Sequence, residues 1–402
     1  PMNDCYPVRI TSWMLEVARR RRNGLARWLW EKVTQPLGEA RWDAPVPWRH
    51  IHAPWWNALL PHALASYDPE VPPTPPDRNG VPRKRYFPVR GVLDRRSGWD
   101  ENDWFLTVTC CPDVRWRSRA GSQHHQADRG HFSFFALGER FLIDSGYGNE
   151  TLSGSTAVIR LGATGEAHSV PEIGGAMQRK SVRASGFANV QLDGWATLAK
   201  MDFHECYPSC ALARRVVMAI PDADGVPLYV AIHDRVEANE RTTYGLYYQV
   251  DPDATVRPLD RETVDLAGGR RGALCRVIAT THSPGRFLVD RFLGHPRLHF
   301  QCQASALHAL TLLIPWRPDE APPVFERSEA DNDAGFTATL RFRGIEDTMF
   351  LSSGVAPDRR YAGDNASPGP GGMLTAGGIE TDAPFGLIRN GSPARIVVVE
   401  GT

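Results

Sequence analysis

Residues 122–146 read SQHHQADRGHFSFFALGERFLIDSG, a polar stretch followed by two short apolar runs. The runs FSFFAL (132–137) and RFLIDSG (140–146) meet at the turn sequence LGER. Alternation of period two on both sides of a glycine turn predicts a β-hairpin. Asp144 follows an apolar run, so we expect its carboxylate at a strand end and partly removed from water. A buried carboxylate requires a cation, a metal ion or several hydrogen-bond donors.

Similar short runs recur along most of the chain. They are residues 104–110, 213–220, 227–237, 242–250, 308–316, 337–342 and 395–400. Turn sequences such as DADG, AGGRRG and RNGSP separate them, and the chain contains 36 Gly and 32 Pro residues. Many strands without long intervening helices predict an antiparallel β-sandwich and not a doubly wound parallel sheet.

The beginning of the chain has a different pattern. Residues 8–35 show helical periodicity with a break at Asn23-Gly24, which predicts two antiparallel helices, and a third helix is expected over Trp55–Leu64. The proline-rich segment 71–82 marks a domain boundary. The predicted fold class is therefore α+β and mainly β. We expect a helical segment over 1–75, a central sandwich over 83–330 and a C-terminal β region over 331–402.

Bulk composition excludes some classes of partner. The 46 Lys and Arg residues balance 46 Asp and Glu residues, so no global positive field would recruit nucleic acid. No run of 18 apolar residues exists, which predicts no membrane span. Seven cysteines argue against a full disulfide framework. Cys206 and Cys210 flank a turn and are either a disulfide or two free thiols.

Polar side chains before the hairpin indicate a site. If residues 124–128 are extended, His124, Gln126 and Asp128 point to one side. Asp144 and His168 from separate segments, joined by His124 or Gln126, would suit one divalent ion such as zinc. The alternative is a hydrogen-bonded His–Asp cluster without an ion.

A row of arginines precedes this stretch. In RWRSR, Arg115, Arg117 and Arg119 share one face if the segment is a strand. They predict either a clamp for a carboxylate or sulfate group or an edge strand protected by charge.

Three segments together resemble the heparinase II/III-like polysaccharide lyases. They are HHQADRGHF (124–132), DSGY (144–147) and HS (168–169). That family has a His-x-His-x-Asp-x-x-x-Phe segment, then Asp-x-Gly-Tyr, then His-Asn or His-Ser. Residues 90–108 are similar to its entry strands, and residues 3–20 to one of the last hairpins of an α/α toroid. The resemblance covers roughly residues 1–260.

The resemblance implies roles for individual residues. His124 matches a histidine that lines the catalytic cleft, and Tyr147 matches a cleft tyrosine. Gln126, Asp144 and His168 match positions that hold a structural zinc in some members. Gln126 departs from the usual histidine, and a neutral amide is a poor zinc ligand.

The resemblance also implies a fold and an activity. The fold is the end of an α/α toroid followed by a β-sandwich, and the activity is β-elimination on a uronate-containing polysaccharide such as alginate or a glycosaminoglycan. The toroid residues that complete this chemistry would precede residue 1. The chain is then a piece of a longer enzyme, a partner of a separate toroid half, or a relative without the chemistry. The rival expectation is a non-catalytic carbohydrate-binding or scaffold protein, and a homo-oligomer stays open. The family implies a periplasmic or secreted location.

Overall fold

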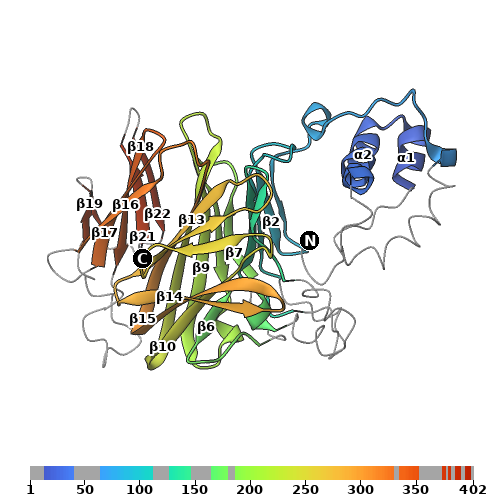
Figure 1. Ribbon diagram of the computed structural model, residues 1–402. Helices are drawn as coiled ribbons and strands as arrows, with labels where there is room; N and C mark the ends of the chain where they lie inside the picture. Colours follow the sequence, from blue (N-terminus) through green and yellow to red (C-terminus); the bar gives the residue numbers. More distant parts are fainter. Residues whose placement is uncertain are drawn as a thin grey trace.

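The computed structural model describes most of the chain (Figure 1). The described residues are 13–39, 64–111, 126–145, 164–179, 186–329, 335–352, 374–376, 379–381, 385–390 and 394–399. Antiparallel sheets make up most of them, and helices are confined mainly to the beginning of the chain. The predicted fold class, mainly β with a short helical N-terminal part, is therefore confirmed.

Two helices precede the sheets. Helix α1 (Trp13–Arg21) and helix α2 (Gly24–Glu39) lie side by side and are separated at the predicted break, where Arg22 has a φ of 49°. The ring of Trp28 on α2 meets that of Trp99 edge to face, with centroids 6.4 Å apart. The third predicted helix, Trp55–Leu64, lies almost entirely outside the described residues. The toroid assignment and the three domain limits stay predictions.

A small sheet follows the helices. Its five strands are, in spatial order, β1 (Lys84–Phe87), β2 (Val92–Arg96), β3 (Phe105–Thr109), β4 (His131–Ala136) and β5 (Glu139–Leu142). All neighbours are antiparallel. The predicted hairpin is β4–β5, and its turn contains Leu137 at φ 57° and Gly138 at φ 82°.

The second sheet is the largest. Its ten strands are β6 (Pro171–Ile173), β7 (Gly186–Gln191), β8 (Thr197–Asp202), β9 (Cys210–Pro221), β10 (Pro227–Gln249), β11 (Thr255–Pro258), β12 (Thr263–Ala267), β13 (Leu274–Thr281), β14 (Gly285–Phe292) and β15 (His295–Trp316). The order β11-β12-β13-β15-β10-β9-β8-β7 forms the main path, with β14 beside β15 and β6 beside β10.

A third sheet follows the large sheet in the sequence. It consists of β16 (Val324–Glu329), β17 (Gly335–Phe342), β18 (Ile345–Ser352), β21 (Phe385–Arg389) and β22 (Arg395–Val399). The pair β19 (Leu374–Ala376) and β20 (Ile379–Thr381) lies beside it.

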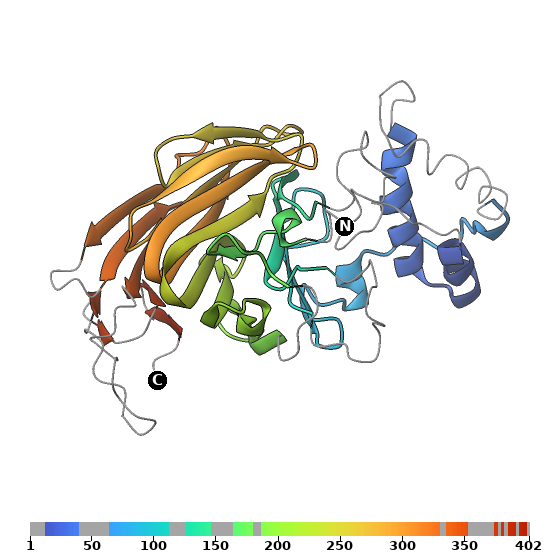
Figure 2. The same cartoon turned by 90° about the horizontal axis from the view of Figure 1, so that it is seen from below.

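The large sheet is the middle of three layers (Figures 1 and 2). On β10, Val230 and Ile232 belong to the core shared with the small sheet, whereas Tyr229 and Ala231 belong to the core shared with the third sheet. A strand covered on both faces needs apolar residues at every position. This explains why PLYVAI at 227–232 is a continuous apolar run.

Two runs that were predicted as separate strands belong to one continuous strand. Run 227–237 lies in β10, as does run 242–250 apart from its last residue, and a register shift between Glu237 and Thr242 marks their junction. The polar residues 239–242 interrupt the apolar alternation because the strand is partly exposed there. Pairing with β15 nevertheless resumes at Thr242, opposite Ala304.

A buried carboxylate joins the small and large sheets. Glu139 on β5 is 3% exposed. It accepts hydrogen bonds from the backbone N–H groups of Arg270, Arg271 and Gly272, in the turn between β12 and β13. We call this arrangement the Glu139 nest. Successive backbone N–H groups that point to one spot form a site for an anion.

The cysteines in the described part of the chain are free thiols, including Cys206 and Cys210. The free-thiol alternative is therefore the correct one for this pair. Burial raises the pKa of both thiols to about 11.

Candidate functional site

The β4–β5 hairpin brings two candidate residues together. His131 is the first residue of β4, and Asp144 comes two residues after the end of β5. The register pairs Phe134 with Leu142, so the chain returns to the start of β4 as it leaves β5. His168 follows a short 3₁₀-helix, Gly165–Ala167, that lies against the same place.

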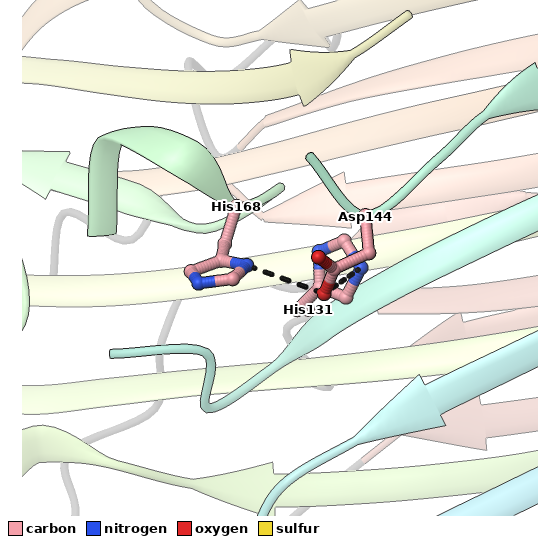
Figure 3. Close-up of side chains that lie close together, drawn as sticks. All are labelled: His131, Asp144 and His168. Atoms are coloured by element: carbon pink, nitrogen blue, oxygen red, sulfur yellow. Dashed lines mark ion pairs between the residues drawn. The ribbon is translucent and has the colours of Figure 1, made fainter. Parts of the chain in front are cut away.

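The three side chains form one buried group, which we call the His–Asp cluster (Figure 3). Oδ2 of Asp144 lies 3.6 Å from Nε2 of His131 and 3.5 Å from Nδ1 of His168. The two rings meet edge to face with centroids 5.3 Å apart. The side chains are at most 2% exposed, so the carboxylate and imidazoles interact in a medium of low polarity.

The hydrogen bonds of His131 determine its tautomer. The backbone N–H of Ser169 donates to Nδ1 at 3.0 Å, so Nδ1 is an acceptor without a proton. The neutral ring then carries its proton on Nε2, which faces Asp144 and lies 3.2 Å from Oγ of Ser133. Burial lowers the pKa of His131 to about 3, against the opposing effect of Asp144. The imidazole is therefore neutral at ordinary pH.

The donor set fits a divalent ion in type and spacing. One ligand atom from each of the three residues lies within 4.8 Å of the others, and imidazole and carboxylate are common zinc ligands. A ligating histidine donates its other ring N–H to a neighbour. Nδ1 of His131 accepts a hydrogen bond instead. Ligation through Nε2 would place the proton of the neutral ring on Nδ1, so the N–H of Ser169 would lose its acceptor.

A second ring of polar groups surrounds the cluster. Ser145 donates from Oγ to the carbonyl of Ala167 at 2.7 Å, and Nε2 of His295 lies 2.9 Å from the same Oγ. From β10, the amide of Gln249 donates to the carbonyls of His168 and Glu166 at 3.0 and 2.9 Å. These contacts fix the segment that carries His168 against the large sheet.

A buried ion pair holds the backbone beside both histidines. Arg215 on β9 and Asp234 on β10 are opposite each other, each 1% exposed, and share two hydrogen bonds of 2.7 and 3.0 Å. Nη1 of Arg215 also donates to the carbonyls of Gly130 and Ser169, at 2.7 and 2.6 Å. Gly130 precedes His131 and Ser169 follows His168, so one guanidinium group positions both segments of the cluster.

The structure brings together part of the predicted site. Asp144 and His168 are adjacent as expected, and their imidazole partner is His131, which the motif contained but to which no role had been given. Gln126 is 3% exposed, and its amide atoms have no hydrogen-bond partner within the described residues. Its role as a ligand stays a prediction. A histidine that opens a hairpin strand opposite an Asp at the strand end is the signal that could have revealed His131.

The prediction that residues 124–128 form a strand is wrong for residues 126–128, the part that the structure describes. Residues 126–130 are irregular and end in a turn in which the N–H of His131 donates to the carbonyl of Asp128 at 2.9 Å. Side-chain alternation therefore does not apply there. Burial raises the pKa of Asp128, while nearby His168 opposes and Asp144 reinforces the shift.

The remaining predicted residues lie outside the described ranges. They are His124, Tyr147, Arg115, Arg117 and Arg119. Their roles stay predictions.

The family model "Heparinase II/III-like, C-terminal" matches residues 92–305, which is more than half of the chain and includes the whole His–Asp cluster. The chain belongs to this family. No curated protein matches the chain significantly.

Solved structures are similar in fold. A heparinase III structure aligns with a TM-score of 0.54 and 15% identity, over 67% of this chain and 42% of the other. The heparan sulfate lyase HepC from Pedobacter heparinus aligns with a TM-score of 0.52 and 16% identity, over 76% and 48%. The present chain spans less than half the length of either. At these identities the likeness shows the fold alone.

None of the helices in the described ranges combines the length and the apolar character needed to cross a lipid bilayer.

Proposed function

We propose that this chain is the sandwich part of a polysaccharide lyase that cleaves an anionic, uronate-containing polymer by β-elimination. The observation that carries the proposal is the family match over residues 92–305, because it encloses the buried cluster that contains Asp144 and His168, two of the residues that the motif predicted. Heparinase III and a heparan sulfate lyase share the fold, which supports a glycosaminoglycan as the polymer, with alginate as the alternative.

The reaction requires three tasks. The uronate carboxylate must be neutralised, the C5 proton removed and the C4 oxygen protonated as it leaves. Donors aimed at the developing charge contribute about 3 to 4 kcal/mol each, and a positioned acid or base contributes about 10² to 10⁴ in rate. In this proposal His124 neutralises charge or moves a proton, Tyr147 orients the sugar, and Arg115, Arg117 or Arg119 holds a substrate anion. Toroid helices complete the site, from the same protein or from a partner.

The His–Asp cluster supports these residues and does not react itself. Its side chains are excluded from solvent, and the low pKa of His131 makes that ring a poor base. In sequence, His131 comes seven residues after His124, and Asp144 comes three residues before Tyr147. The cluster therefore anchors the two segments that carry the proposed cleft residues.

We also propose that the cluster holds one structural zinc ion, with His131, Asp144 and His168 as ligands. When bound, the ion would add a cross-link between the hairpin and the segment after residue 164. Metal content of the purified protein, measured by mass spectrometry, tests this. His131→Ala should abolish bound zinc, whereas His204→Ala, at a partly exposed histidine beside Asp202, should retain it. A wild-type protein without metal that unfolds identically with and without a chelator would support the metal-free cluster.

Gln126 is tested in the same assay. If Gln126→Ala also lowers the zinc content, the amide belongs to the ligand set. Unchanged content would assign the third protein ligand to His131 alone.

The activity is tested by incubating the protein, together with its toroid part, with heparan sulfate, chondroitin sulfate and alginate. The unsaturated product of elimination absorbs in the ultraviolet, whereas hydrolysis gives saturated ends. We expect absorbance to rise with one polymer and to fall steeply in a His124→Ala variant that retains its unfolding temperature. If the protein binds a polymer but forms no product even when the toroid part is present, the carbohydrate-binding or scaffold alternative would be favoured instead. A periplasmic or secreted location belongs to the same proposal.

A further inference from the structure

A pocket on the large sheet, away from the His–Asp cluster, contains three arginines. It has a volume of about 350 Å³ and lies where β10, β14 and β15 meet the segment before β12. Its lining residues are Arg241, Thr243, Arg261, Pro284, Gly285, Arg286, Gln301, Cys302 and Gln303. A volume of this size suits a single small ligand or one unit of a larger one.

Strand register explains why these polar residues converge. Thr243 is opposite Gln303, and Arg286 is opposite Gln301. Since alternate residues of a strand share a face, Gln301 and Gln303 point to the same side as their partners. The opposite face of β10 here carries Tyr244 and Leu246, which belong to the core between the small and large sheets. The polar row is therefore the outer face of the sheet.

The three guanidinium groups lack a carboxylate partner within the described residues. Arg241, Arg261 and Arg286 are exposed. The nearby arginines on the same sheet are paired instead: Arg276 with Asp265, and Arg297 with Asp290. The acid next to Arg261, Glu262, lies 3.8 Å from Arg327. Three positive charges that line one hollow without an ion-pair partner among the described residues favour an anion there.

The neutral lining residues complete the chemistry of the pocket. The amides of Gln301 and Gln303 and the hydroxyl of Thr243 offer both donors and acceptors. This combination suits a ligand with hydroxyl groups beside an acidic group. The described residues that line the pocket include no aromatic ring.

The pocket is separate from the His–Asp cluster. Gln249, which binds the backbone of His168, lies six residues along β10 from Thr243. At about 3.4 Å per residue, this places the pocket roughly 20 Å from the cluster.

We propose that this arginine pocket is a second binding site, for a carboxylate- or sulfate-bearing sugar unit of an acidic polysaccharide. Arginine forks match the planar carboxylate and the oxygens of sulfate. The identity of the polymer rests on the proposed function, whereas the preference for an acidic sugar rests on the pocket. A second site along the outer face holds a polymer chain on the protein between cleavage events.

Calorimetric titration of the whole chain tests the proposal, with a heparan sulfate tetrasaccharide, neutral maltotetraose and inorganic sulfate as probes. We expect the wild-type protein to bind the acidic tetrasaccharide and not maltotetraose. The combined substitution Arg241→Ala, Arg261→Ala and Arg286→Ala should weaken binding by about tenfold or more, because each exposed ion pair contributes modestly. Arg257→Ala, at an exposed arginine on β11 outside the pocket, should change the affinity less than about twofold.

The other outcomes overturn the proposal. Equal affinity of the triple variant and the wild type would show that the pocket does not bind the sugar. Inorganic sulfate that binds as tightly as the tetrasaccharide would show a site for a free anion. The variants carry exposed substitutions, so equal unfolding temperatures are expected and exclude misfolding as the cause. Binding that depends on the pocket, in a protein that shows no lyase activity even when its toroid part is present, would refute the proposed function and support this inference.

Discussion

Replacing Arg215 by methionine tests how the large sheet supports the His–Asp cluster. The substitution leaves Asp234 buried without its partner and removes the donors to the carbonyls of Gly130 and Ser169. Breaking a buried ion pair costs about 3 to 5 kcal/mol. A buried carbonyl that loses its donor adds about 1 kcal/mol or more. With one donor lost at each of the carbonyls of Gly130 and Ser169, we expect Arg215→Met to lower the free energy of unfolding by about 5 to 7 kcal/mol.

A second variant separates the two contributions. In Arg215→Met combined with Asp234→Leu the buried charge is gone, and such apolar replacements are often neutral for the pair itself. The carbonyls of Gly130 and Ser169 still lack their donors. The double variant should therefore recover part of the loss and remain about 2 kcal/mol less stable than the wild type.

The assay is urea unfolding, followed by hydrogen exchange of the Ser169 amide. Arg235→Met is the matched control, because Arg235 is the next residue on β10 after Asp234 and pairs with Glu237 at about one-third exposure. Such a pair contributes at most about 1 kcal/mol. Exchange at Ser169, whose N–H donates to His131, should accelerate in Arg215→Met only. A loss no larger than that of the control, with unchanged exchange, would refute the positioning role.

Three further predictions concern stability. Glu139→Ala removes the anion from the Glu139 nest and should cost about 2 kcal/mol in urea unfolding; a loss below about 0.5 kcal/mol would contradict the nest. The hydrogen bond from Arg297 lowers the pKa of Asp290, so this pair stabilises the fold above the unfolded pKa and is lost as the pH falls below about 4. The stability difference between wild type and Asp290→Asn should therefore shrink in acid, and a constant difference would argue against the pair. Because the thiols of Cys206 and Cys210 are free, the unfolding temperature should not change on adding a reductant; a drop would reveal a disulfide.

The general fold was predictable from local pattern, because alternation and turn residues depend on near neighbours in sequence. The β4–β5 hairpin and the break between the two helices follow directly from such signals. The ion pair of Arg215 and Asp234 could not be predicted from such local signals. In ARRVVMAI, Arg214 and Arg215 look equivalent, but only the second is buried, since the register of β9 on β10 places it opposite Asp234.

The candidate site was predictable only in part for a related reason. Asp144 and His168 were found because their motif positions are distinctive. His131 was not found, because its role depends on the irregular segment before β4. In that segment, side chains do not alternate between two faces as they do in a strand. The arginine pocket was also invisible in the sequence, since its residues come from segments 241–243, 261, 284–286 and 301–303 and converge only through strand pairing.

The two-sided burial of the large sheet has a consequence for synthesis of the chain. Once residue 316 has been made, all strands of that sheet exist, but the layer that covers Tyr229, Ala231 and Leu312 is completed only by strands that end at residue 399. Until then, one apolar face is open to water and to other nascent chains. We therefore expect the chain to be prone to aggregation during this interval.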